Sequence, residues 1–89
     1  MSERARRTKT VFDAVAALGQ AGIESFGPGD VTAHLRAEGT PYGAWEVRGE
    51  LSILERLGLV ELDEETASWR LVNGATFSIE AANAARGRS

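Results

Sequence analysis

The chain has 89 residues and no cysteine, and its 13 acidic and 10 basic residues give a formal net charge of −3. The absence of cysteine excludes disulfides, thiolate zinc sites and cysteine nucleophiles. No apolar run approaches the roughly 18 residues that span a bilayer, and the first residues lack the apolar run of a signal peptide, so a cytoplasmic protein is expected. This length predicts one domain with a single hydrophobic core.

Basic residues concentrate at the start of the chain, where Arg4, Arg6, Arg7 and Lys9 lie close together. Residues 1–7 show no apolar periodicity and are expected to form a flexible basic arm. Such an arm is either a solvated tail or a segment that follows phosphates or enters a minor groove. Basic ends around an acidic centre are compatible with DNA binding by a protein that is acidic overall.

Two helices are expected before residue 40. The first begins at Thr8 and ends near residues 19–22, because apolar residues recur at helical spacing: Val11, Phe12, Val15 and Leu18. Residues 23–26 alternate between apolar and polar side chains and predict a very short strand. Pro28 and Asp30 then predict a helix over 28–38, since proline suits the first helical position and a carboxylate is favourable there.

A third helix is predicted over residues 41–57. Thr40 is expected to cap its start with Pro41 in the first position, and Gly58 supplies the left-handed residue that ends it. At 100° per residue one face is apolar, with Val47, Leu51 and Leu54. The opposite face carries Trp45, Gly49, Ser52 and Arg56, with Tyr42 and Arg48 on its flanks.

The last third of the chain predicts a β-hairpin and a weak terminal helix. Residues 59–62 and 68–72 have strand character, and the polar residues 63–67 form the turn between them. The alanine-rich segment 79–85 predicts a short helix in a C-terminal extension over 74–89. The predicted fold is α+β, mostly α, and its expected core is Val11, Phe12, Val15, Leu18, Val31, Leu35, Val47, Leu51, Leu54, Leu59 and Leu71, with Trp69 as a core or edge-packing residue.

The predicted order over residues 8–73, three helices and a two-stranded hairpin, resembles the winged helix-turn-helix family. The most specific stretch runs from Val47 to Val60. Its Val-Arg pair, Leu-x-x-Leu spacing, Glu-Arg pair and final Gly-Leu-Val are similar to the third helix and wing entry of small prokaryotic transcriptional regulators. The resemblance implies that the 41–57 helix enters the major groove of double-stranded DNA. The implied DNA contacts are Tyr42, Trp45, Arg48, Gly49, Ser52 and Arg56, assisted by Arg4, Arg6, Arg7 and Lys9 from the arm.

Two features leave a second interpretation open. The 41–57 helix has only two basic residues, Arg48 and Arg56, against Glu46, Glu50 and Glu55. The hairpin turn carries Asp63, Glu64 and Glu65, which would repel phosphates, so this wing is expected to stay out of a DNA groove. Winged-helix domains also serve as protein-interaction modules without DNA binding. In that interpretation Trp45, Gly49 and Ile53 form an apolar contact strip.

Individual residues of the 41–57 helix each allow more than one interpretation. Trp45 is either a core residue or an exposed aromatic that meets a partner. Arg48 and Arg56 are either solvated or paired with a nearby glutamate, or they contact DNA. Gly49 costs about 1 kcal/mol relative to alanine in mid-helix, which the close approach of a phosphate or another helix would explain.

No arrangement of side chains indicates catalysis. His34 is the single histidine and has no partner set for metal binding, and the carboxylates do not pair with a candidate nucleophile. The protein is therefore expected not to be an enzyme and to hold no cofactor, metal or small-molecule ligand. A homodimer is expected, built from the 79–85 segment, the outward side of the first helix, or both.

Overall fold

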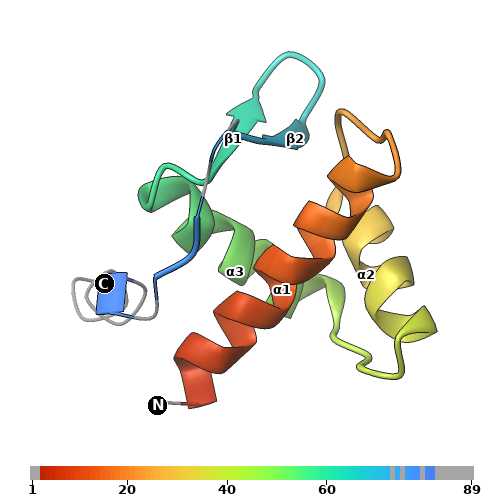
Figure 1. Ribbon diagram of the computed structural model, residues 1–89. Helices are drawn as coiled ribbons and strands as arrows, with labels where there is room; N and C mark the ends of the chain where they lie inside the picture. The colour runs from red at the N-terminus through yellow and green to blue at the C-terminus, as the bar shows by residue number, and fades with distance from the viewer. Residues whose placement is uncertain (1–2, 73, 75, 79, 82–89) are drawn as a thin grey trace.

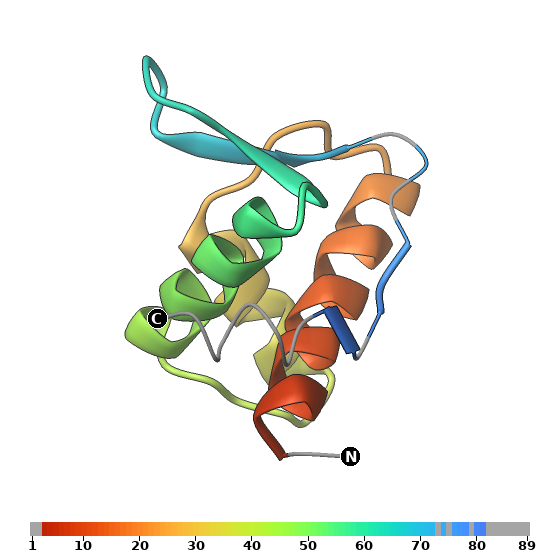
Figure 2. The same cartoon turned by 90° about the vertical axis from the view of Figure 1, so that its left-hand side faces the viewer.

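The computed structural model describes residues 3–72, 74, 76–78 and 80–81, with the backbone alone for Glu3 and Arg4. The elements follow in the order α1 (Glu3–Gln20), α2 (Pro28–Ala37), α3 (Ala44–Arg56), β1 (Val60–Asp63) and β2 (Ser68–Leu71). The two strands form an antiparallel sheet that lies across one end of α1 and α3 (Figures 1 and 2). This confirms the predicted fold of three helices and a C-terminal hairpin, which we call the wing.

Helix α1 begins earlier than the sequence predicted. Residues 3–7 are helical, and Ala5 and Thr8 are fully buried. The flexible arm expected over residues 1–7 is therefore wrong for residues 3–7, while residues 1 and 2 lie outside the described part. The buried stripe of α1 continues toward the N-terminus through small side chains, Ala5 and Thr8, which an apolar periodicity does not detect.

Helix α3 begins at Ala44, so the prediction of Thr40 as cap and Pro41 as first helical residue is wrong. Gly43 is the N-cap, and its N–H donates to Oε1 of Glu46 at 3.0 Å. This glutamate contact satisfies a backbone donor and places a negative charge at the positive end of the helix. The end of α3 is as predicted, because Gly58 has φ +76°.

Helix α2 begins at Pro28 as predicted, and the N–H of Gly27 donates to Oδ2 of Asp30 at 2.8 Å. The strand expected over residues 23–26 is reduced to a single bridge between Phe26 and Trp69 of β2. Their backbone groups exchange hydrogen bonds of 2.8 and 2.7 Å. This bridge fastens the loop between α1 and α2 to the wing, whose own register pairs Val60 with Leu71 and Leu62 with Trp69.

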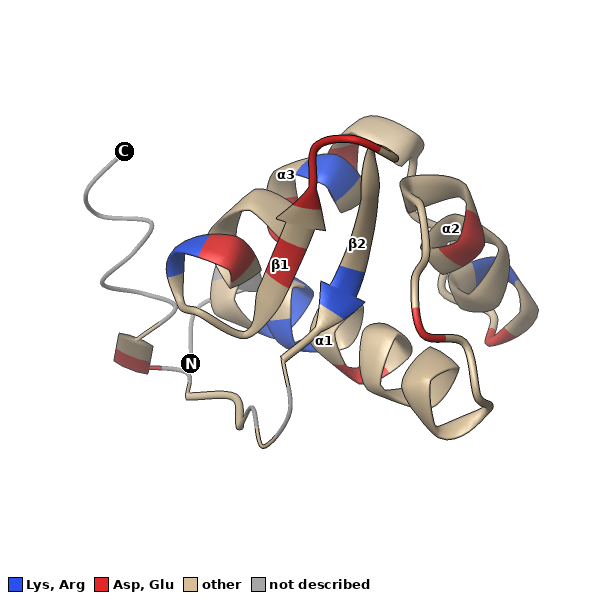
Figure 3. Cartoon of the chain, turned by 90° about the horizontal axis from the view of Figure 1, so that it is seen from above, with Lys and Arg blue, Asp and Glu red and all other residues tan. Residues whose placement is uncertain are grey.

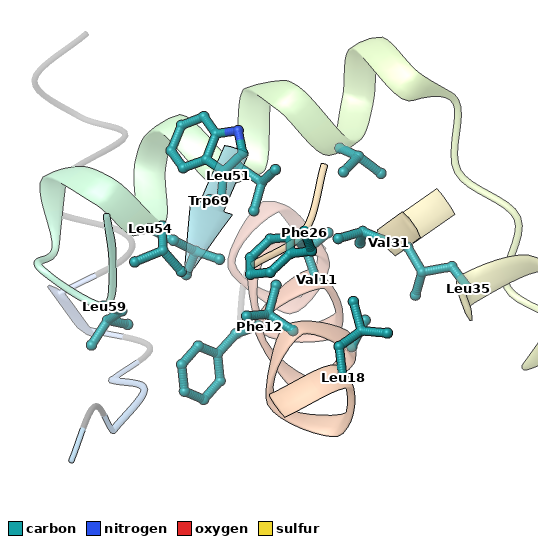
Figure 4. Close-up of a cluster of buried hydrophobic side chains, with 14 residues drawn as sticks. Val11, Phe12, Leu18, Phe26, Val31, Leu35, Leu51, Leu54, Leu59 and Trp69 are labelled. Carbon is teal, nitrogen blue, oxygen red and sulfur yellow. The ribbon is translucent and has the colours of Figure 1, made fainter. Parts of the chain in front are cut away.

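The core forms between all three helices and the wing (Figure 4). Every predicted core residue is buried except Leu71, which is partly buried, and Trp69 is buried as expected. The core also takes in Ala14, Phe26 and Val60. Burial of this apolar surface is the main stabilising contribution to the fold.

The chain after the wing returns to α1. Phe77 packs on Phe12, with ring centroids 5.8 Å apart. Most of the helix predicted over 79–85 lies outside the described residues, but Glu80 and Ala81 are helical, and the N–H of Ala81 donates to Oγ of Ser78 at 3.3 Å. None of the described helices is long and apolar enough to cross a membrane.

Candidate nucleic-acid interface

The outward side of α3 is the most distinctive surface of the molecule. Because α3 buries Val47, Leu51 and Leu54 against the core, its opposite side faces solvent. The exposed residues on that side are those the helical wheel predicted, and we call them the α3 stripe: Trp45, Arg48, Gly49, Ser52 and Arg56. Trp45 is 83% exposed, so its interpretation as a core residue is wrong.

The first turn of the α3 stripe holds a tryptophan and an arginine in contact. The guanidinium carbon of Arg48 lies 5.5 Å from the centre of the Trp45 ring, a cation–π geometry that restrains both side chains. Within the part of the chain that the structure describes, neither Arg48 nor Arg56 has a carboxylate within salt-bridge distance. The charge of Arg56 is therefore available to an anionic partner, whereas Arg48 lines a groove together with Glu64 of the wing.

The middle of the stripe is small and flat. A Cβ placed on Gly49 would meet no atom within 4 Å, so no neighbour in the described fold requires glycine there. Ser52 donates its hydroxyl to the carbonyl oxygen of Arg48 at 3.1 Å, which leaves its oxygen able to accept a hydrogen bond from outside. This part of α3 can therefore be approached closely.

Basic residues of α1 adjoin the start of α3, but not as a mobile arm. Arg7 lies 5.8 Å from the centre of the Tyr42 ring and 3.6 Å from Oε2 of Glu46. Lys9 pairs with Asp13 at 2.8 Å within α1. Arg7 and Tyr42 thus join the two helices at the edge of the α3 stripe.

The other two basic residues predicted in the arm differ from these. Arg6 is exposed and has no carboxylate partner among the described residues. The side chain of Arg4 lies outside the described part. Arg6 is therefore a cation on the outward side of α1, away from the stripe that α1 buries through Ala5 and Thr8.

The wing tip brings acidic side chains close to one residue of the α3 stripe, because Glu64 and Arg48 line the same groove. Figure 3 shows acidic residues along the turn between β1 and β2. Asp63, Glu64 and Glu65 are exposed, and the N–H of Glu65 donates to Oδ1 of Asp63 at 3.0 Å. A groove of about 350 Å³ separates the wing from α3 and the start of α2. It is lined by Pro28, Arg48, Leu62, Glu64, Ala67 and Trp69.

The sequence interpretation missed the role of Glu50. This carboxylate is 5% exposed and accepts a hydrogen bond of 2.6 Å from the hydroxyl of Thr8. On the helical wheel Glu50 lies beside Leu54, so the wheel could have shown its inward direction. Its partner, 42 residues away in the chain, could not be deduced. Since Glu50 faces α1, its carboxylate is not part of the α3 stripe.

Other chemistry is not indicated by the described residues. They contain no group of three or more His, Cys, Asp and Glu side chains that could hold a metal ion. Nε2 of the half-buried His34 lies 3.6 Å from Oε1 of Glu38, one turn further along the chain. No model of a known protein family, no curated protein and no solved structure matches this chain.

Proposed function

We propose that this protein binds double-stranded DNA through α3 and regulates transcription, without enzymatic activity. The observation that carries the proposal is the exposed α3 stripe, set among three helices and a wing. The major groove is wide enough for one α-helix, and the groove edges accept hydrogen bonds from arginine in particular. Arg48 and Arg56 are the proposed contacts to bases or phosphates, and Ser52 and Gly49 allow close approach.

The charge distribution supports contact through the helices. Glu50 is turned toward α1 and Glu46 is near Arg7, so two of the three α3 carboxylates do not act at the stripe unopposed. The acidic wing tip would repel phosphates, so the wing is proposed to remain outside the groove.

A dimer is part of the proposal. One recognition helix covers few base pairs, and the small number of unpaired arginines limits the electrostatic contribution to affinity. Two copies on a two-fold symmetric site would double the number of base pairs covered and the number of arginines that contact phosphates. The proposed contact surfaces are the outward side of α1 and the 79–85 segment.

A second candidate function is protein recognition without DNA. The groove between α3 and the wing favours it, because Leu62 is 37% exposed there beside Trp69. The groove thus offers apolar contacts beside the carboxylate of Glu64, and Trp45, Gly49 and Ile53 would form a separate contact strip on α3. Association through it would depend little on salt, unlike binding to phosphates.

Selection from a random duplex library tests the primary proposal. The full-length protein is incubated with the library at low salt, and bound duplexes are amplified and sequenced over several rounds. We expect one enriched motif, and we expect Arg48→Ala to bind the enriched duplex more weakly. Arg36→Ala is the matched control, because Arg36 is exposed in the last turn of α2 and lies outside the α3 stripe. A library without any enriched motif would contradict the proposal.

A further inference from the structure

Trp45 is the most exposed of the large apolar side chains in the described part of the chain. It is 83% exposed, compared with 40% for Ile23 and 37% for Leu62. The indole ring adds nothing to the core and leaves a large apolar surface in water, which is unfavourable unless a partner covers it. Its place in the first turn of α3 puts that surface where a groove-binding helix meets base edges.

The major groove offers one kind of apolar contact. Its edges carry hydrogen-bond donors and acceptors, except for the methyl group at C5 of thymine. 5-Methylcytosine presents the same methyl group at the same place. An indole face pressed on a polar edge would leave that edge without its hydrogen bonds, whereas a methyl group loses nothing by the contact.

Arg48 places a hydrogen-bond donor, which can recognise a base edge, beside this ring. It follows Trp45 by three positions on the same side of α3, and its guanidinium carbon lies 5.5 Å from the ring centre. The stack restrains the guanidinium fork, which matches O6 and N7 of guanine. Successive base pairs are about 3.4 Å apart, so the ring and the fork can reach neighbouring base pairs together.

We infer that Trp45 reads the C5 methyl group of a pyrimidine, and that Arg48 reads a guanine in the adjacent base pair. This inference rests on the proposed function and adds to it the chemical identity of one position in the site. Gly49, one turn from Trp45, and Ser52, two turns from it, are small enough for α3 to lie deep in the groove. Trp45 is then a specificity-determining residue.

The test uses the duplex that the wild-type protein enriches. Each thymine is replaced in turn by deoxyuridine, which removes the methyl group, and each cytosine by 5-methylcytosine, which adds one. We expect one position where the methylated base binds about fourfold tighter, the change that corresponds to about 0.8 kcal/mol for one buried carbon group. The deoxyuridine and 5-methylcytosine arms show which base supplies the methyl group.

Two variants connect the effect to Trp45. Trp45→Ala should bind the methylated and unmethylated duplexes equally, and Trp45→Phe should retain part of the difference. The high exposure of Trp45 means that both variants should fold, which their thermal unfolding checks. A wild-type protein insensitive to every methyl group, or an unchanged sensitivity in Trp45→Ala, would overturn the inference while the enriched motif still supported DNA binding. Failure to enrich any duplex would overturn both.

Discussion

Gly49 lies in the middle of α3 on its exposed side, where a Cβ would meet no atom within 4 Å. Alanine is a better helix former than glycine by about 1 kcal/mol. We therefore expect Gly49→Ala to raise the free energy of unfolding by up to about 1 kcal/mol in urea denaturation. We expect the same variant to bind DNA more weakly, because the added methyl group would separate α3 from the groove.

Gly19→Ala is the matched control for that substitution. Gly19 lies near the end of α1, and a Cβ there would sit 3.8 Å from Cδ2 of Leu71, an ordinary contact. This variant should not lose stability and should bind DNA as the wild type does. Unchanged DNA affinity in Gly49→Ala would show that nothing approaches α3 closely at this position.

The buried hydrogen bond between Thr8 and Glu50 fixes α1 against α3. Thr8→Val keeps the shape of the side chain and removes the donor, so a buried carboxylate loses one of its hydrogen bonds. We expect a loss of about 1–3 kcal/mol in the free energy of unfolding, measured by urea denaturation. Thr10→Val is the control, because Thr10 bonds to the carbonyl of Arg6 on the exposed side of α1. Equal losses in the two variants would contradict a special role for the buried pair.

At the scale of elements, the first turns of α1 belong to the folded domain. Deleting residues 1–7 removes Ala5, which is fully buried, and the contacts of Arg7 with Tyr42 and Glu46. We expect the truncated protein to melt at a lower temperature, because α1 loses buried surface and helix length. Arg6→Ala, which alters an exposed side chain, should melt within the small range typical of surface substitutions. An unchanged melting temperature after truncation would mean that α1 contributes nothing before Thr8.

Much of the element order could be predicted from the sequence because its signals are local. Pro28 with Asp30 marks the start of α2, and Gly58 marks the end of α3. The start of α1 was not predicted because its buried stripe continues through Ala5 and Thr8. These small side chains lie among charged residues and give no apolar periodicity. The start of α3 was placed too early because Thr40 and Pro41 have the residue types of a helix start. The structure instead caps the helix at Gly43 through Glu46.

The sequence predicted which side of α3 faces solvent, but not the tertiary contacts of the residues around the candidate site. The helical wheel placed the α3 stripe opposite Val47 and Leu51, and the structure confirms this. It could not decide whether the hairpin covers Trp45, since that depends on how the wing packs. The pairing of Glu50 with Thr8 likewise depends on the tertiary contact between α1 and α3.

For the whole molecule, the proposed dimer is based on the limited area that a single recognition helix would offer. We expect a homodimer in sedimentation experiments at micromolar concentration, with or without DNA. A truncation to residues 1–76 tests whether the C-terminal segment contributes to the contact. Monomers of both proteins, also in the presence of the enriched duplex, would contradict the proposed dimer.

The dependence of DNA affinity on salt tests the central proposal most directly. Binding of the enriched duplex is measured by fluorescence anisotropy over a range of salt concentrations for the wild type, Arg48→Ala, Arg56→Ala and Arg36→Ala. The logarithm of the association constant should fall linearly with the logarithm of salt concentration, and each lost phosphate contact should reduce the slope by about 0.9. We expect a smaller slope for Arg56→Ala, a smaller slope or weaker binding for Arg48→Ala, and no change for Arg36→Ala. An affinity that is independent of salt, or unaffected by both α3 substitutions, would contradict DNA recognition by α3.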